Sequence, residues 1–71
     1  MNLTDVEHGN DYMVKDIKTE DEELKSFLFS LGCYCGETIT VVSRKRGNFV
    51  LSIKDARYNI DEGLAALIEI N

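Results

Sequence analysis

The clearest pattern in the chain is an apolar stripe of helical spacing, in which apolar side chains recur three, four and seven positions apart. Such spacing places side chains on one face of a helix. Thr19 and Glu22 have the spacing of a capping box at its start. Gly32 stands where a left-handed residue ends many helices. The sequence therefore predicts a helix over residues 20–31, with Phe29 off the stripe and with a buried face formed by Leu24, Phe27, Leu28 and Leu31.

After residue 36 the pattern changes to the two-residue alternation of β-strands, and β-branched residues become frequent. Gly47 and Asn48 suit a hairpin turn between the first two strands. Asp61 suits the cap of a short helical turn before the last strand. The predicted strands cover residues 37–43, 48–54, 57–60 and 68–70.

The N-terminal segment predicts one more strand, over residues 11–18, and a second capping box at Thr4 and Glu7. Val14 and Ile17 are three positions apart, so strict alternation fails and a β-bulge is expected between them. Short strands with hairpin connections bury one face best by curling into a barrel. We therefore expect a mainly β fold: a single domain over residues 1–71, built as a small barrel of about five strands capped by one helix.

The net charge of the chain and its distribution narrow the classes of molecule that the protein can bind. The 71 residues carry 8 basic and 13 acidic side chains, a net charge of −5. Residues 1–23 hold eight acids and two lysines, or −6, which argues against nucleic acid. The one basic cluster, residues 44–46, is typical of a solvated hairpin tip. No apolar run reaches the roughly 20 residues of a membrane span, and no signal peptide is recognisable, so a cytoplasmic location without membrane insertion is expected.

Three residues are candidates for metal binding: Cys33, Cys35 and His8. Thiolates are soft ligands for iron or zinc, but a structural zinc site needs four ligands and no second cysteine pair exists. The preferred interpretation is that Cys33 is a small apolar residue after the helix and Cys35 an exposed turn residue. We expect no required cofactor, at most weak iron or zinc binding, and no catalytic residues. The alternative is a small metal-binding or metal-sensing protein that uses the two cysteines.

Two aromatic residues, Phe29 and Tyr34, lie around the predicted end of the helix and outside its apolar stripe. Exposed aromatic side chains that cluster in one place mark binding surfaces. The alternative is that Tyr34 packs over the barrel end and Phe29 covers a neighbouring strand. We expect Phe29 and Tyr34 to contribute to a partner-binding surface.

The order of these segments resembles the ferrous iron transport protein A (FeoA) family over nearly the full length. The resemblance rests on weak patterns at matching spacings: the helix end with its glycine, a second glycine before two valines, and a Leu-Ala then Ile, Ile series near the C-terminus. Many members have proline where this chain has His8 and Cys35, and many have a longer hairpin loop around residues 44–48. The matching residues are Leu3, Val6, Gly9, Val14, Ile17, Leu28, Leu31, Gly32, Gly36, Ile39, Val41, Val42, Ile60, Asp61, Leu64, Ala65, Ile68 and Ile70.

The resemblance implies an SH3-like barrel and a function. Members of the family act alongside an FeoB-type membrane transporter and are thought to bind its cytoplasmic GTP-binding region, which promotes ferrous iron uptake. A similar barrel forms the C-terminal domain of iron-dependent repressors. The expectation for this chain is therefore a small, non-enzymatic, monomeric accessory protein of ferrous iron uptake.

Overall fold

A computed structural model describes residues 1–71. The chain begins with a 3-10 turn and forms five strands, one helix of ten residues and a shorter second helix. In chain order the elements are the 3-10 turn (Leu3–Asp5), β1 (Asp11–Ile17), α1 (Glu22–Leu31), β2 (Thr38–Lys45), β3 (Asn48–Ile53), β4 (Ala56–Asp61), α2 (Glu62–Ala65) and β5 (Ile68–Ile70).

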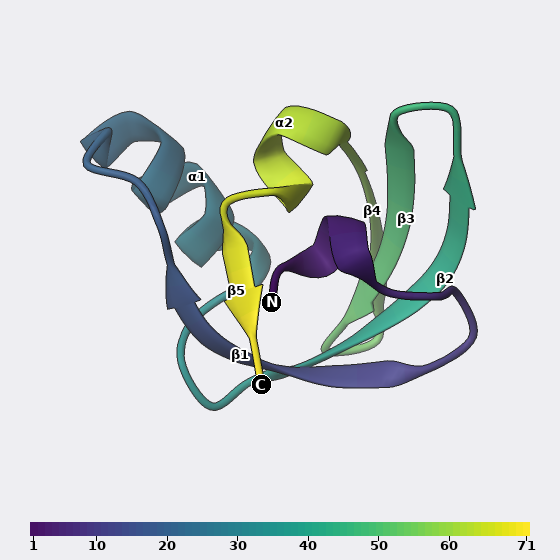
Figure 1. The fold of residues 1–71 in the computed structure, drawn as a ribbon. Helices are drawn as coiled ribbons and strands as arrows, with labels where there is room; N and C mark the ends of the chain where they lie inside the picture. Colours follow the sequence, from purple (N-terminus) through teal and green to yellow (C-terminus); the bar gives the residue numbers. More distant parts are fainter.

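The five strands form one antiparallel sheet in the order β4-β3-β2-β1-β5. The sheet curls strongly, with α1 lying to one side of it and α2 between β4 and β5 (Figure 1). The mainly β fold class with one main helix is therefore confirmed. The β1 strand holds the curl together, because its first half pairs with β2 and its second half with β5.

The alternation read from the sequence matches the burial of the strands. In β3, Phe49, Leu51 and Ile53 are buried while the residues between them are partly exposed. The β1 strand contains the predicted bulge, since its register with β5 shifts between Val14 and Asp16. The buried core consists of Leu3, Val6, Val14, Ile17, Leu28, Cys33, Ile39, Val41, Phe49, Leu51, Ile53, Ile60, Ala65, Ile68 and Ile70.

The predicted buried face of α1 is wrong in part. Only Leu28 is fully buried, and the side chain of Phe27 is 47% exposed. Successive side chains of a helix point in directions that differ by about 100°. Phe27 and Phe29 therefore point to opposite sides of the buried side chain of Leu28. The buried face continues through Gly32, which is also buried, and this shifts its centre away from Phe27. Leu24 and Leu31 are only half-buried.

Both predicted capping boxes are wrong. The helix begins at Glu22, and the side chain of Asp21 accepts hydrogen bonds from the backbone N–H groups of Glu23 and Leu24. Near the N-terminus the capping box is formed by Asn2 and Asp5. Asp and Asn cap helices as well as Thr does, so several neighbouring candidates competed at each start. The predicted cap of the short C-terminal helix is confirmed, since the Asp61 side chain accepts from the N–H of Leu64 at 2.8 Å.

The hairpin turn predicted at Gly47 and Asn48 lies one position earlier in the structure. The turn between β2 and β3 is formed by Arg46 and Gly47, and Asn48 already belongs to β3. The turn between β3 and β4 is formed by Lys54 and Asp55, both with positive φ (49° and 69°). Positive φ at both central residues is the signature of the tight turns that match the twist of paired strands.

Replacing Leu28 by alanine tests how α1 is docked. Leu28 is fully buried, so the cavity left by Leu28→Ala should lower the free energy of unfolding by about 2–5 kcal/mol. Phe27→Ala is the matched control on the same helix, and its cost should stay near about 0.5 kcal/mol because the side chain is half exposed. Urea denaturation measures both. Equal losses in the two variants would contradict the observed orientation of α1.

Candidate partner-binding site

Phe29 and Tyr34 form an exposed aromatic pair at the C-terminal end of α1. Their ring centroids are 6.2 Å apart and the rings are nearly perpendicular, at 86°. This edge-to-face arrangement is a favourable geometry for two aromatic rings. Phe29 is 49% exposed and Tyr34 is 36% exposed. The two predicted site residues therefore lie together, and neither is buried against a strand. We call this pair the aromatic patch.

The backbone that presents the aromatic patch turns at Gly32. This residue has φ of +101° and donates its N–H to the carbonyls of Leu28 and Phe29, which ends the helix. A Cβ atom added there would lie 2.8 Å from Cγ2 of Ile53, so the position excludes any larger residue. Positive φ and the close approach both require glycine. The predicted left-handed end of α1 is thus confirmed, and it orients the segment that carries Tyr34.

Two further contacts hold the turn that follows. The N–H of Gly36 donates to the carbonyl of Val14 at 2.9 Å, and the N–H of Val14 donates to the carbonyl of Glu37 at 2.8 Å. Since Val14 belongs to β1, the end of the turn is fastened to this strand, while Gly32 before the turn lies against Ile53 of β3. The aromatic patch therefore stands on a backbone that is anchored at both ends.

A lysine from the β3–β4 hairpin fixes the Tyr34 ring. Lys54 Nζ donates a hydrogen bond to the Tyr34 hydroxyl at 2.5 Å and lies 3.5 Å from Oε1 of Glu37. The ammonium is 4.9 Å from the ring centroid. That distance follows from its position beside the hydroxyl, so the contact is a hydrogen bond rather than a cation stacked over the ring face. The hydrogen bond that Lys54 donates to Tyr34 is the main cause that raises the pKa of Lys54, and the charge of Glu37 also raises it, against a smaller opposing effect of desolvation. Lys54 therefore stays protonated at neutral pH.

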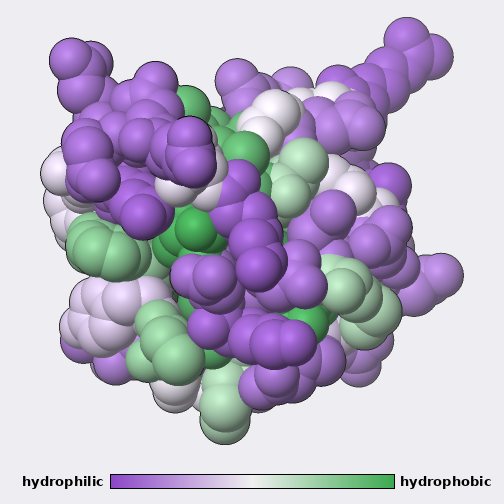
Figure 2. Space-filling view, turned by 60° about the vertical axis from the view of Figure 1, so that its left-hand side comes forward, coloured by the Kyte–Doolittle hydropathy of each residue, from purple (hydrophilic) through white to green (hydrophobic).

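Large apolar side chains are few on the surface of the molecule. In Figure 2 hydrophilic residues cover most of the face shown, while apolar and weakly polar side chains gather toward its lower left. Most large apolar side chains are in the core, so the few that remain exposed stand out. The exposed ones are Met1, Met13, Phe27, Phe29 and Tyr34.

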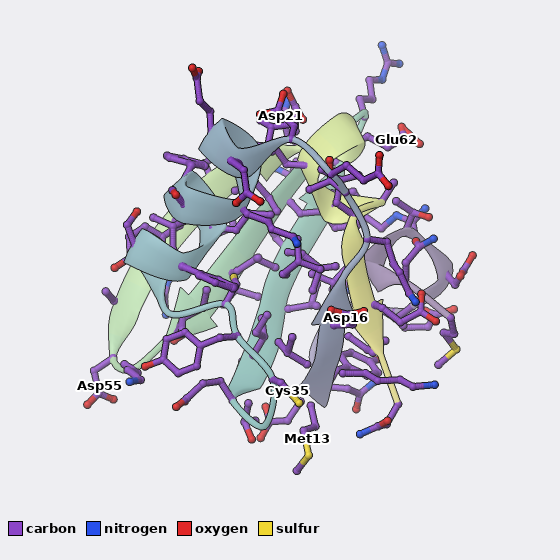
Figure 3. The ribbon with its side chains drawn as sticks, turned by 90° about the vertical axis from the view of Figure 1, so that its left-hand side faces the viewer. Met13, Asp16, Asp21, Cys35, Asp55 and Glu62 are labelled. Atoms are coloured by element: carbon purple, nitrogen blue, oxygen red, sulfur yellow. The ribbon has the colours of Figure 1, made fainter.

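The two cysteines do not share a site. Cys33 is fully buried in the core, whereas Cys35 is exposed at the lower end of the molecule in Figure 3, near Met13. Burial raises the pKa of the Cys33 thiol from 9.0 to about 11, so it is not a thiolate at neutral pH. The thiol of an unfolded chain ionises nearer pH 9, so this burial makes the folded state less stable as pH rises above 9. The preferred interpretation of both cysteines, an apolar residue after the helix and an exposed turn residue, is confirmed.

No cluster of three or more His, Cys, Asp or Glu side chains in the structure is arranged to hold a metal ion. His8 is exposed in the turn before β1, beside Gly9. The surface has one hollow, next to the start of α1, and five of its six lining residues are charged or polar. The six are Asp16, Ile17, Lys18, Thr19, Glu20 and Lys25.

The basic cluster at the β2–β3 hairpin is only partly a solvated tip. Arg44 Nη1 donates to the carbonyl of Val6 at 2.9 Å, and its guanidinium lies 5.1 Å from the centroid of the Phe49 ring. Arg44 therefore ties the hairpin to the N-terminal segment. Lys45 and Arg46 are the residues of this cluster that remain free and exposed.

Comparison with known proteins identifies the family. The sequence model of the FeoA domain matches residues 1–71. The chain belongs to the FeoA family. Membership supports a role in ferrous iron transport and association with the Feo transport system, in a family of small accessory domains that are not known as enzymes. A search of curated proteins finds no match, and no helix in the chain is long and apolar enough to cross a membrane.

Solved structures confirm the SH3-like fold. A crystal structure of the iron uptake regulatory protein FeoA is 26% identical, with a TM-score of 0.88 over 100% of this chain and 95% of that one. FeoA of Stenotrophomonas maltophilia in complex with zinc, described as a prokaryotic SH3 domain protein, is 14% identical with a TM-score of 0.88 (100% and 89%). A manganese-dependent transcriptional repressor is 19% identical, with a TM-score of 0.90 over 99% of this chain and 39% of that one. The two more distant structures show the fold alone.

Sequence reasoning missed Lys54, which orients Tyr34 from a hairpin twenty positions away. No local pattern marks it, because a lysine in a tight turn is normally a solvated residue. It also missed the exposure of Phe27. The sequence carries no signal for this exposure, because the burial of Gly32, which moves the buried face of the helix away from Phe27, is visible only in the structure.

Thiol chemistry tests the placement of the cysteines. In the folded protein Ellman's reagent should react quickly with one thiol, that of Cys35, because Cys33 is buried and protonated. Both thiols should react in denaturant. The Cys35→Ser variant should show almost no rapid reaction when folded. Two rapidly reacting thiols in the native protein at pH 7 would mean that Cys33 is not in the core.

Proposed function

We propose that this protein is a cytoplasmic accessory protein of ferrous iron uptake that binds the cytoplasmic GTP-binding region of an FeoB-type transporter through the aromatic patch. Membership of the FeoA family supports the transport role. The observation that carries the binding surface is the exposed, edge-to-face pair of Phe29 and Tyr34 on a backbone anchored to β1 and β3.

Rigidity makes such a pair suitable for binding. A flexible aromatic side chain loses conformational entropy when a partner immobilises it, which reduces the affinity. Here the Tyr34 ring is already held by Lys54, and Phe29 sits on the last turns of α1. A pair in which one ring is held and the two rings are in contact can therefore insert into an apolar pocket of the partner at a reduced entropic cost. Aromatic side chains are among those that dominate binding energy when they become fully desolvated.

Charge around the patch directs the approach. Residues 1–23 carry a net charge of −6, and Glu22 and Glu23 lie at the first turn of the helix that ends beside the patch. A basic surface on the partner would attract this acidic protein. Such steering by exposed charges weakens as salt rises, because charges are screened over about 10 Å at 0.1 M.

Alanine variants of the aromatic patch test the proposal. Phe29→Ala and Tyr34→Ala should each weaken binding to the isolated cytoplasmic domain of the transporter about 30-fold, the loss expected for an anchor worth about 2 kcal/mol. Phe27→Ala is the matched control, since it removes an equally exposed phenylalanine from the other flank of the same helix. Lys54→Ala should cause a smaller loss, because the Tyr34 ring remains but is no longer held. Isothermal titration calorimetry gives the affinities of variants first shown to be folded.

The alternative surface is the β2–β3 hairpin tip. Lys45→Ala combined with Arg46→Ala removes its two free charges without touching the Arg44 contact to Val6. If only this double variant lost binding, the aromatic patch would be excluded as the site. If the wild-type protein failed to bind the transporter domain, the proposed partner itself would be wrong.

We also propose that folding requires no metal. The core is continuous and the buried cysteine in it is a protonated thiol, so the fold has no evident use for a metal crosslink. The melting temperature should be the same before and after dialysis against EDTA, and Cys35→Ser should melt within a degree or two of the wild type. A fall of the melting temperature on EDTA treatment, reversed by zinc or ferrous iron, would favour the metal-binding alternative.

A further inference from the structure

The two edges of the sheet differ in how they are covered. At the β5 edge, the N–H of Ile70 donates to the carbonyl of Met1 at 2.8 Å, and Asn2 forms a β-bridge with Glu69. This N-terminal segment covers the strand like a short extra strand. At the other edge, β4 pairs only with β3. In Figure 3, β4 runs upward from the hairpin of Asp55 along the left-hand border of the molecule.

Hairpin geometry identifies the free backbone groups of β4. The turn of Lys54 and Asp55 has two residues, so the closing pair of Ile53 and Ala56 shares hydrogen bonds and every second pair after it does the same. The intervening residues of β4 therefore point their N–H groups away from β3. These residues are Arg57, Asn59 and Asp61, all with exposed side chains, and no other segment donates a backbone hydrogen bond to the carbonyl of Arg57 or Asn59.

The β4 edge lacks most of the features that normally prevent strand pairing between molecules. Such features include bulges, prolines and covering segments. The register of β3 and β4 is unbroken, whereas the β1–β5 and β2–β3 pairs both contain a shift. The chain contains no proline. The remaining protection is the charge of Arg57 and of Asp61, and its effect depends on which residues lie opposite in the pairing.

We propose that β4 pairs antiparallel with β4 of a second copy of this chain, about a two-fold axis at Asn59. A residue that lies a given number of positions before Asn59 then faces the residue that lies the same number of positions after Asn59 in the second copy. Arg57 faces the second copy's Asp61, and Asp61 faces the second copy's Arg57. Opposite charges at facing positions on neighbouring strands are stabilising. The surface is thus complementary to itself, as a two-fold interface requires.

Charge excludes the neighbouring registers. An axis at Arg57 would place the two arginines opposite each other. An axis between Arg57 and Asn59 would place Asp55 opposite the second copy's Asp61. Like charges that face each other directly are destabilising. Only the axis at Asn59 pairs the charges correctly while using the outward N–H groups of all three residues.

Both charged groups are available for this contact. Neither Arg57 nor Asp61 belongs to any of the three ion pairs within the chain. Asp61 uses Oδ1 to cap α2, and this leaves Oδ2 for a guanidinium. A few strand residues bury far less than the roughly 1,000 Å² of a stable interface, so the dimer is weak. In this proposal the protein is a monomer at low concentration, and pairs form as concentration rises.

Dilution in an NMR experiment tests the pairing. Spectra of 15N-labelled wild-type protein between about 1 mM and 20 µM should show concentration-dependent amide shifts centred on Arg57, Asn59 and Asp61, with slower exchange of these amides at the high end. An absence of concentration dependence up to 1 mM would overturn the proposal. Shifts centred instead on the aromatic patch, or on any other surface, would overturn it as well.

Variants separate strand pairing from other association. Asn59→Pro removes an outward N–H without breaking the β3 ladder, so the protein should stay folded and lose self-association. Arg57→Asp places two acids opposite each other and should weaken the dimer about tenfold or more. Lys45→Ala, in an exposed part of β2, is the control and should leave association unchanged. Unchanged association in the folded Asn59→Pro and Arg57→Asp variants would exclude β4.

Exchanging the charges of Arg57 and Asp61 gives a further test, in which pairing is restored rather than lost. Arg57→Asp and Asp61→Arg should each fail to pair with itself, while their equimolar mixture should form a heterodimer in which both facing pairs are again opposite in charge. Native mass spectrometry or sedimentation of the mixture measures this recovery. If both variants are folded and the mixture stays monomeric, the proposed register is wrong. If Asp61→Arg does not fold, because it loses the cap of α2, Asn59→Pro and Arg57→Asp decide the question.

Discussion

The close approach of Gly32 to Ile53 is the constraint on which the working parts of this molecule depend. It ends α1, and it places the next residue, Cys33, inside the core. It also brings the segment of Tyr34 beside the β3–β4 hairpin, where Lys54 can reach the tyrosine hydroxyl. A side chain at this one position would push the helix end away from the sheet. The aromatic patch would then lose both its backbone support and the lysine that orients its ring.

The pattern of the strands was predictable, because a curled sheet buries one face and the two-residue alternation records which one. Phe49, Leu51 and Ile53 show this plainly, and the bulge in β1 was visible as a three-residue spacing. The buried face of α1 was less predictable. The helix contributes one fully buried side chain, Leu28, and a stripe of four apolar residues overstates how much of a small helix is docked. Its start was misplaced for a related reason, since Thr19 and Asp21 are both good caps and only the path of the chain decides between them.

The candidate site could be predicted from the sequence only in part. That Phe29 and Tyr34 would be neighbours follows from their positions on either side of a helix end. Their mutual geometry does not, because it depends on Lys54 and Glu37, which approach from other parts of the chain. The difference in how the two edges of the sheet are covered could not be predicted from the sequence either. It follows from the pairing of Met1 and Asn2 with β5, a contact between residues almost seventy positions apart that no local pattern announces.

The division of β1 between two partners has a consequence for the order in which the protein folds. Its first half pairs with β2, but its second half waits for β5, which comprises residues 68–70. Until β5 docks, the second half of β1, which carries the apolar side chain of Ile17, therefore has no partner strand. The contacts that close the barrel join residues with some of the largest separations in the sequence. Such contacts form late because a long loop must be closed first. The closure of the barrel is thus a late step of folding, and the barrel forms as one cooperative unit.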